Sequence, residues 1–331
     1  MNPKYSVVIP VYNRPDEVDE LLQSLCSQTY RNFEVVVVED GSAIPCKQVV
    51  DKYAEALDVH YFEKPNSGPG QTRNYAAERS RGEYLLILDS DCILPETYLA
   101  AVEAELQREP ADAFGGPDRA HDSFSDVQKA INYAMTSFFT TGGIRGGKKK
   151  MDKSYPRSFN MGVRAEVYKA LGGFSAMRFG EDIDFSIRIF KGGYRCRLFP
   201  EAWVWHKRRT DLKKFFKQVH NSGIARIDLY KKYPESLKLV HLLPAVFTVG
   251  VVMVLLVAFI CPWSLLLLAL FAVVIFIDAS IRNKSIKIGA LSVIAAFIQL
   301  TGYGSGFLRA WWRRCVCGGK SFSAFEKTFY K

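Results

Sequence analysis

Two carboxylates one residue apart, Asp89 and Asp91, directly follow an apolar run at residues 84–88. At the end of a strand, this spacing can direct carboxylate oxygens toward a divalent cation that carries a diphosphate. Hard cations such as Mg²⁺ and Mn²⁺ prefer oxygen ligands and usually share them with substrate phosphates. Acid-rich turns also follow strands for purely structural reasons. The pair therefore predicts a metal–diphosphate site, with an ordinary surface turn as the alternative.

The segments that must position this pair alternate between strand and helix patterns. We expect strands at residues 6–10, 34–38, 59–63 and 84–88, because these short runs are apolar and bounded by turn residues. Between them, apolar side chains recur at helical spacing in three segments, at residues 16–27, 47–57 and 70–80. This alternation predicts an α/β sheet, in which ligands bind at the carboxyl ends of the strands.

Polar or glycine-containing segments follow all four expected strands. Pro10, Tyr12 and Asn13 end the first strand, and Asp40 ends the second within a Glu-Asp-Gly-Ser run. The third strand is followed by an Asn-Ser-Gly-Pro-Gly run and then by Arg73. Any one of these segments could be an ordinary turn or helix entry. Their occurrence in order on successive strands favours one shared site.

These motifs, in order VIPVYNR, EDGS, NSGPGQTRN and DSD, resemble the nucleotide-sugar half of family 2 glycosyltransferases, which have the GT-A fold. Further along, FNMG, GGF and GEDID are similar to the acceptor-side motifs of that family. The resemblance covers residues 5 to about 230. It implies a nucleotide-sugar-binding α/β sheet with helices on both faces, and an inverting sugar transfer.

The resemblance also implies roles for the matching residues on the donor side. Asp40 reads the nucleobase, Tyr12 or Asn13 packs near it, and Pro10 belongs to the same donor-binding segment. Arg73 lies beside the nucleotide. Within the D-x-D pair, the second carboxylate is the stronger ligand of a divalent metal, Mg²⁺ or Mn²⁺, and the first supports the ribose or the metal.

On the acceptor side, the resemblance implies that Asp182 is the general base, with Glu181 beside it. An inverting transfer needs a carboxylate to take the acceptor hydroxyl proton while the anomeric carbon is attacked, and a metal neutralises the departing diphosphate. The alternative explanation of this pair is structural, because the helix dipole favours acids at the N-terminus of a helix. His206 could complete the metal shell, bind the diphosphate, or serve a structural role.

The charge distribution points to a membrane rather than to nucleic acid as a partner. The net charge is +10, and residues 237–331 carry +8 of it, with ten Lys/Arg and two acids. Residues 239–277 contain no charged residue and are interrupted by Cys261-Pro262-Trp263, which predicts a helical hairpin; residues 288–308 form a second charge-free run. The positive-inside rule places the 282–287 loop in the cytoplasm. The third segment either spans or lies re-entrant or interfacial.

Two further segments have open interpretations. Residues 203–232 contain nine Lys/Arg and two acids on a helical pattern, which could bind a membrane surface or diphosphates. Residues 142–153, rich in Gly and Lys, could be a gating loop over the donor or a plain surface loop. Seven scattered cysteines without a CxxC pair favour a reducing compartment over a disulfide framework or a zinc site.

Together these features predict a glycosyltransferase domain at residues 1–235, with a donor half at about 1–115 and an acceptor half at about 116–235. Residues 236–331 form a membrane region with two to three helices and a basic tail.

We expect a multi-pass cell-membrane protein with a cytoplasmic catalytic domain. It moves a hexose from a nucleotide sugar, with a UDP-sugar favoured, to a glycan or polyprenyl-linked acceptor in cell-surface polysaccharide biosynthesis. A processive polysaccharide synthase and a non-catalytic nucleotide-sugar-binding scaffold are the alternatives. The sugar, the acceptor and the oligomeric state stay open.

Overall fold

The computed structural model describes residues 3–119, 124–142, 156–207 and 210–319. The chain divides into two compact units, which are described separately. The first unit contains the described residues within 1–121 and 151–207. The second unit contains the described residues within 122–150 and 208–321. Of the segment at 142–153 that could gate the donor, residues 143–153 lie outside the described part of the chain.

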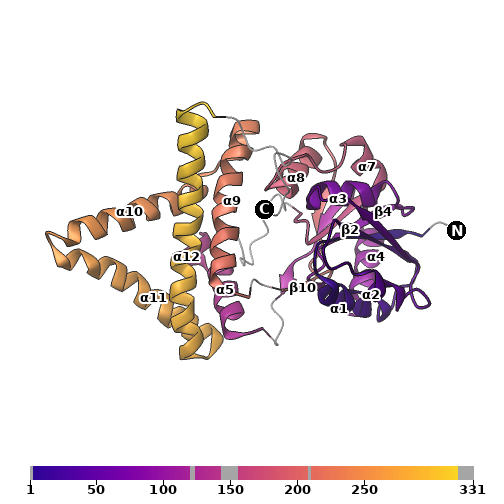
Figure 1. The fold of residues 1–331 in the computed structure, drawn as a ribbon, viewed down its shortest axis with the longest axis horizontal. Helices are drawn as coiled ribbons and strands as arrows, with labels where there is room; N and C mark the ends of the chain where they lie inside the picture. The colour runs from indigo at the N-terminus through magenta and orange to yellow at the C-terminus, as the bar shows by residue number, and fades with distance from the viewer. Residues whose placement is uncertain (1–2, 120–123, 143–155, 208–209, 320–331) are drawn as a thin grey trace. The chain divides into compact units, whose positions relative to one another are not determined.

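A sheet forms the centre of the first unit (Figure 1). It is mixed and has seven strands, in the order β3-β2-β1-β4-β8-β6-β9. Its first four strands are parallel, and β8 runs antiparallel to β4 and β6. The four strands predicted from the sequence are all confirmed. The sheet consists of β1 (Tyr5–Val11), β2 (Phe33–Asp40), β3 (Val59–Lys64), β4 (Tyr84–Leu88), β6 (Ala113–Gly115), β8 (Asn160–Arg164) and β9 (Cys196–Leu198).

Helices cover both faces of this sheet, as predicted. Side chains alternate along β1, so that Val7 and Ile9 enter one buried cluster with α1 and α4, whereas Val8 enters the other with α3, α7 and α8. These helices are α1 (Pro15–Cys26), α3 (Pro69–Ala77), α4 (Tyr98–Arg108), α7 (Ala165–Ala170) and α8 (Glu181–Lys191). The order 3-2-1-4 reverses between β1 and β4, and such a switch point is where ligands bind in these sheets.

The helix expected at residues 47–57 is shorter in the structure. α2 (Lys47–Asp51) ends early, and the chain continues in turns with hydrogen bonds from residue i+3 to residue i, such as Tyr53 N to Val50 O at 3.0 Å. Its N-cap, Cys46, makes no side-chain capping hydrogen bond. A helix of so few residues without a cap is marginal, which explains the early end.

A small second sheet has the order β5-β10-β7. Its strands β7 and β10 come from later parts of the chain, and β10 lies beside β5, which directly follows β4. This sheet consists of β5 (Cys92–Ile93), β7 (Asp118–Arg119) and β10 (Val204–His206). The antiparallel register of β5 and β10 places His206 opposite Cys92. The histidine therefore arrives beside the D-x-D pair, although more than a hundred residues separate them.

The second unit is helical. Three of its segments are long and apolar enough to cross a membrane: Leu239–Ala258, Pro262–Asn283 and Ile286–Val316, with mean hydropathies of 2.5, 2.6 and 1.5. The predicted turn at Cys261-Pro262-Trp263 separates the first two. The elements are α5 (Asp126–Thr136), α6 (Phe138–Thr141), α9 (Leu212–Lys232), η1 (Pro234–Ser236), η2 (Leu239–His241), α10 (Leu243–Ala258), η3 (Pro262–Ser264), α11 (Leu265–Asn283), α12 (Ile286–Trp311) and η4 (Trp312–Val316).

The two compact units differ from the sequence-based division at residue 235. Helices α5 and α9 precede that residue but belong to the second unit, because their apolar faces pack on α12. One buried cluster joins Ile131 of α5, Phe215 and Val219 of α9, and Ala295 of α12. The division of the chain into a sugar-transferring domain and a membrane region stays a prediction.

Candidate active site

The carboxylate of Asp40, at the end of β2, is held by the loop that follows β3. Its Oδ1 accepts hydrogen bonds from Lys64 Nζ at 2.6 Å and Ser67 N at 2.8 Å. Its Oδ2 accepts from Gly68 N at 2.9 Å and Asn66 Nδ2 at 3.3 Å. A carboxylate offers about four lone-pair positions, and these four donors use them. The side chain thus orders the Asn-Ser-Gly loop, and its predicted reading of a nucleobase stays a prediction.

Asn13 fixes the loop after β2 from the end of β1. Its backbone adopts a left-handed conformation with φ 53°. Its Oδ1 accepts hydrogen bonds from Ala43 N at 2.7 Å and Ile44 N at 3.0 Å, and its own N donates to Ser42 Oγ at 2.7 Å. Tyr12 precedes it, and Pro10 pairs with Val38 of β2.

An open hollow of about 330 Å³ lies between the loops after β2 and β3. It is lined by Glu39, Gly41, Ser42, Pro45, Glu63, Lys64 and Pro65. The predicted donor residues Asn13 and Asp40 shape these two loops. The sequence pattern did not single out Lys64, which holds the carboxylate of Asp40; its place at the end of β3, beside the other polar strand ends, was the available signal.

The buried guanidinium of Arg73 joins the donor motif to the acceptor motif. Its Nη2 donates to Asp89 Oδ1 at 2.6 Å, and its Nη1 donates to Glu181 Oε1 at 3.1 Å. The Arg73 side chain is only 4% exposed, and its guanidinium carbon lies 5.3 Å from the centroid of the Phe174 ring. Burial lowers the pKa of Arg73, but the two carboxylates outweigh it and raise the pKa above its ordinary value. Arg73 therefore stays charged and links segments that lie far apart in the sequence.

Glu181 and Asp182 begin α8, after Gly180 with φ 81°. Burial of Glu181 and the adjacent charge of Asp182 raise the pKa of the Glu181 carboxyl, whereas Arg73 opposes this rise. Asp182 Oδ2 lies 3.1 Å from Arg157 Nε, an arginine that the sequence pattern did not indicate. The fully buried Asp184 pairs with Arg188 and accepts from Ser175 Oγ, so its role is structural.

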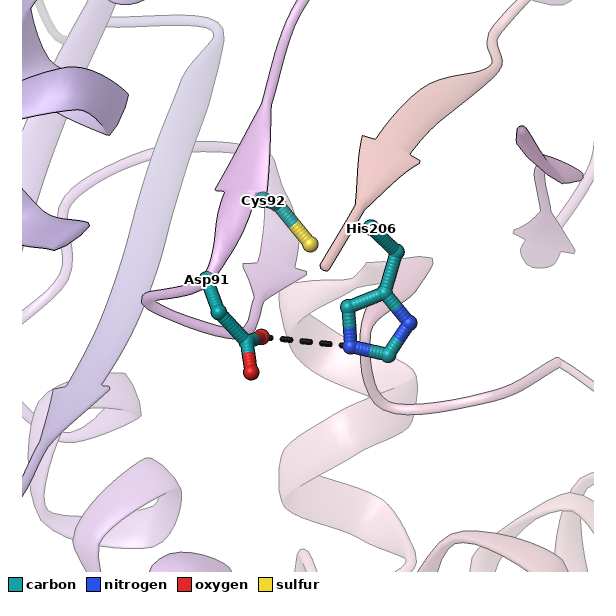
Figure 2. Close-up of side chains that lie close together, drawn as sticks. All are labelled: Asp91, Cys92 and His206. Carbon is teal, nitrogen blue, oxygen red and sulfur yellow. Dashed lines mark ion pairs between the residues drawn. The ribbon is translucent and has the colours of Figure 1, made fainter. Parts of the chain in front are cut away.

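Asp91, Cys92 and His206 form a group whose ligand atoms all lie within 4.8 Å of one another (Figure 2). Asp91 Oδ1 lies 3.1 Å from His206 Nε2. The His206 ring stacks on Phe159 with centroids 4.8 Å apart. The structure thus brings together two of the three predicted metal residues, and the pairing of β5 with β10 is the cause.

The donor set suits a hard divalent cation held by Asp91 and His206. The carboxylate suits Mg²⁺ or Mn²⁺, and the imidazole nitrogen, a softer donor, favours Mn²⁺ of the two. The Cys92 thiol instead donates to the Phe159 carbonyl at 3.3 Å, and burial raises its pKa well above the ordinary value, so it stays protonated. Asp89, the third predicted ligand, lies outside the group found among the described residues, and its Oδ1 faces Arg73.

Arg14 is a charged neighbour of this pair that the sequence reasoning did not assign. Its Nη1 donates to Asp91 Oδ2 at 2.6 Å, so the two oxygens of Asp91 face an arginine and a histidine. Arg14 follows Asn13 in the first motif, and its position there was the available signal. A bound cation would have to share or displace this guanidinium.

Comparisons with known proteins show which family and fold the chain has. A family model described as glycosyl transferase family 2 matches residues 6–172. Poly(ribitol-phosphate) beta-N-acetylglucosaminyltransferase TarS of Staphylococcus aureus is 37% identical over 113 residues, which are 33% of this chain and 20% of TarS. An uncharacterized glycosyltransferase of Rickettsia felis is 30% identical over 137 residues, which are 41% of this chain and 22% of that protein. The chain therefore spans about a fifth of the length of these curated relatives.

Two solved structures share the fold. TarS 1-349 in complex with UDP-GlcNAc matches with a TM-score of 0.50 and 22% identity, over 67% of this chain and 66% of that chain. The mannosyltransferase PcManGT from Pyrobaculum calidifontis, in complex with GDP-Man and Mn²⁺, matches with a TM-score of 0.67 and 19% identity, over 95% and 88%. These likenesses confirm the predicted GT-A sheet. Since the family model matches half of the chain, this protein belongs to glycosyl transferase family 2.

Proposed function

We propose that the protein is a metal-dependent, inverting glycosyltransferase at the cytoplasmic face of the cell membrane. It takes a hexose from a nucleotide sugar, first of all a UDP-sugar, and transfers it to a hydroxyl of a glycan or polyprenyl-linked acceptor in cell-surface polysaccharide biosynthesis. The observation that carries the proposal is the Arg73 bridge between Asp89 and Glu181. It places Asp89 of the predicted donor site beside Glu181, the neighbour of the predicted base Asp182, at the switch point of the sheet.

Different side chains of the site can carry out different parts of the sugar transfer. Asp182 takes the proton of the acceptor hydroxyl while the hydroxyl oxygen forms a bond to the anomeric carbon. The bond from that carbon to the diphosphate oxygen breaks, and the nucleoside diphosphate leaves with the electron pair. A divalent cation at Asp91 and His206 would neutralise the diphosphate charge. Arg157, whose Nε lies 3.1 Å from Asp182 Oδ2, would hold this carboxylate in place for the step.

The comparisons support the choice of donor and metal. The TarS structure contains UDP-GlcNAc, and the mannosyltransferase structure contains GDP-Man with Mn²⁺. UDP-sugars therefore come first in a substrate panel, with GDP-sugars second. The three apolar segments support membrane residence, and with it an acceptor that is held at the bilayer.

The experiment uses the full chain in liposomes with polyprenyl-linked glycans and a panel of nucleotide sugars, and it measures release of nucleoside diphosphate. Asp182→Asn keeps the side-chain shape but removes the proton acceptor, so turnover should fall about 10²–10⁴-fold, while donor binding stays nearly unchanged. Asp51→Asn, an exposed carboxylate paired with Lys47, is the matched control and should retain full activity. An Asp182→Asn rate above about a tenth of wild type would move the base to Glu181. Donor binding without turnover by any panel member would favour the non-catalytic scaffold.

A further inference from the structure

The third apolar segment, α12 with η4, is long enough to cross a membrane, yet its packing indicates a different placement, at the membrane surface. We propose that α12 does not cross the bilayer but lies along its headgroup layer beside α9, with the α10–α11 hairpin as the inserted element. The partner of the α9–α12 layer is thus the surface of a lipid bilayer. The inference rests on the membrane residence in the proposed function and on no other part of it.

Helices α9 and α12 run side by side in the same direction (Figure 1). A Cβ added to Gly302 would lie 2.6 Å from Val219 Cγ2, and one added to Gly306 would lie 2.0 Å from His220 O. Further along, Asp228 pairs with Arg314. The contact positions rise together in both helices, so the two share one direction and one depth over their common length.

The charges of α9 exclude it from the hydrocarbon core. Each charged residue at the centre of a membrane helix costs about 2.5–3.5 kcal/mol. The longest stretch of α9 without a charge, residues 218–225, would span only about 12 Å at 1.5 Å per residue, against a core of about 30 Å. The seven charged residues of α9 are Lys213, Lys214, Lys217, Arg226, Asp228, Lys231 and Lys232. Because α12 lies at the same depth, it stays at the surface with α9.

The α10–α11 hairpin leaves this layer at an angle. The start of α10 meets α12 where Thr248 Oγ1 donates to Leu300 O at 3.4 Å, and the end of α11 meets it where Gly289 faces Ser280. The two helices converge on a tip away from α12 (Figure 1), where Phe259 and Ile260 are 88% and 90% exposed. So α12 lies across the base of the hairpin, as an interfacial helix does, rather than parallel to it.

Ion pairs tie both ends of α12 to the polar helices. At one end, Lys287 Nζ lies 2.7 Å from Asp126 of α5. At the other end, the buried Arg314 pairs with Asp228 of α9, and Lys231 Nζ donates to the Arg314 carbonyl at 3.0 Å. If α12 crossed the membrane, its two ends would lie on opposite sides of the bilayer, and the ion-paired residues of α5 and α9 would lie there with them. With both ends on one side, Arg313 and Arg314 lie on the same side as α9, as the positive-inside rule favours.

The chain's own cysteines provide the test. Cys261 lies at the hairpin tip and Cys317 lies after α12, and both are exposed. In a full-length chain without cysteines, with Ala at the buried positions 46 and 92, Cys261 and Cys317 are restored one at a time. Lys213→Cys provides the reference for α9. Each variant is labelled with a membrane-impermeant maleimide in right-side-out and in inverted vesicles.

We expect Cys317 to be labelled on the same side as Lys213→Cys, and Cys261 not to be labelled from that side. Labelling of Cys317 on the side opposite to Lys213→Cys would overturn the proposal, because α12 would then cross. Monodisperse elution in detergent shows that each variant is folded. Extraction of the chain by alkaline carbonate would overturn both membrane residence and the inference. Sugar transfer is measured separately, so a failure of the catalytic proposal is distinguishable from a failure of this one.

Discussion

Arg73 offers the sharpest test of the site, because its substitution leaves two carboxylates without their cation. In Arg73→Met, the apolar stem of the side chain is kept, but Glu181, 12% exposed, loses its partner in the interior. Asp89, 30% exposed, is better solvated and contributes less. Removing one partner of a buried ion pair costs about 3–5 kcal/mol, which lowers Tm by roughly 6–20 °C for a unit of this size.

The loss should depend on pH in a defined direction. The pKa of Glu181 is raised in the folded protein from 4.5 to about 7, by burial and by Asp182. The folded state then holds the proton more tightly than the unfolded state, so stability falls as pH rises through this window. Loss of Arg73 raises the folded pKa further. The destabilisation by Arg73→Met should therefore be small at about pH 5 and grow toward about pH 8.

The measurement is thermal unfolding of the full chain in detergent over this pH range. With Phe at positions 263, 311 and 312, the fluorescence of Trp203 and Trp205 reports on the first unit alone. Adding Glu181→Gln to Arg73→Met should recover most of the loss at high pH. Arg108→Met is the control and should cost at most about 1 kcal/mol, because Arg108 is exposed and its partner Glu105 keeps a second arginine, Arg197. A loss from Arg73→Met that is equal at both ends of the pH range would refute the reasoning.

Three further predictions concern the metal pair and the second unit. Asp91→Asn should weaken Mn²⁺ binding at least about tenfold in calorimetry, whereas Asp89→Asn should weaken it less, since its carboxylate faces Arg73; equal losses would show that both bind the ion. Arg14→Gln should tighten Mn²⁺ binding, because the guanidinium competes for Asp91 Oδ2; weaker binding would exclude this competition. A chain ending at Tyr233 should aggregate without detergent in size-exclusion chromatography, because α9 loses the α12 surface that buries its apolar face; a monodisperse product would contradict this packing.

The central sheet could be predicted from the sequence because its signals are local. Each of the first four strands is a short apolar run with turn residues after it, and the polar segments fall at the carboxyl ends that meet at one edge. The family resemblance implied Asp91 as a metal ligand, and completion of the metal shell was one of the roles open to His206. What the sequence alone could not supply is the pairing of β5 with β10, which is set by tertiary packing over a long separation.

The partners of the site residues were harder to predict than the residues themselves. Arg14 pairs with Asp91, and Arg157 pairs with Asp182. The charges near each arginine in the sequence do not indicate either partner. Likewise, the basic segment at 203–232 indicated an amphipathic helix, but nothing in its own spacing identifies α12 as the surface it covers. Contacts of this kind depend on the three-dimensional arrangement of segments that are each compatible with several neighbours.

The glycines of α12 also bear on the order in which the protein is made. Gly306 lets the backbone of α9 approach closely, Gly304 does the same for the start of α10, and Gly302 makes room for the Val219 side chain of α9. The same residues give α12 a lower mean hydropathy than either hairpin helix, which makes it the weakest candidate for insertion during synthesis. Since α9 and the hairpin leave the ribosome first, the surfaces that α12 needs are already in place when it emerges. We therefore expect α12 to pack onto α9 and the hairpin after all three of these helices have been made.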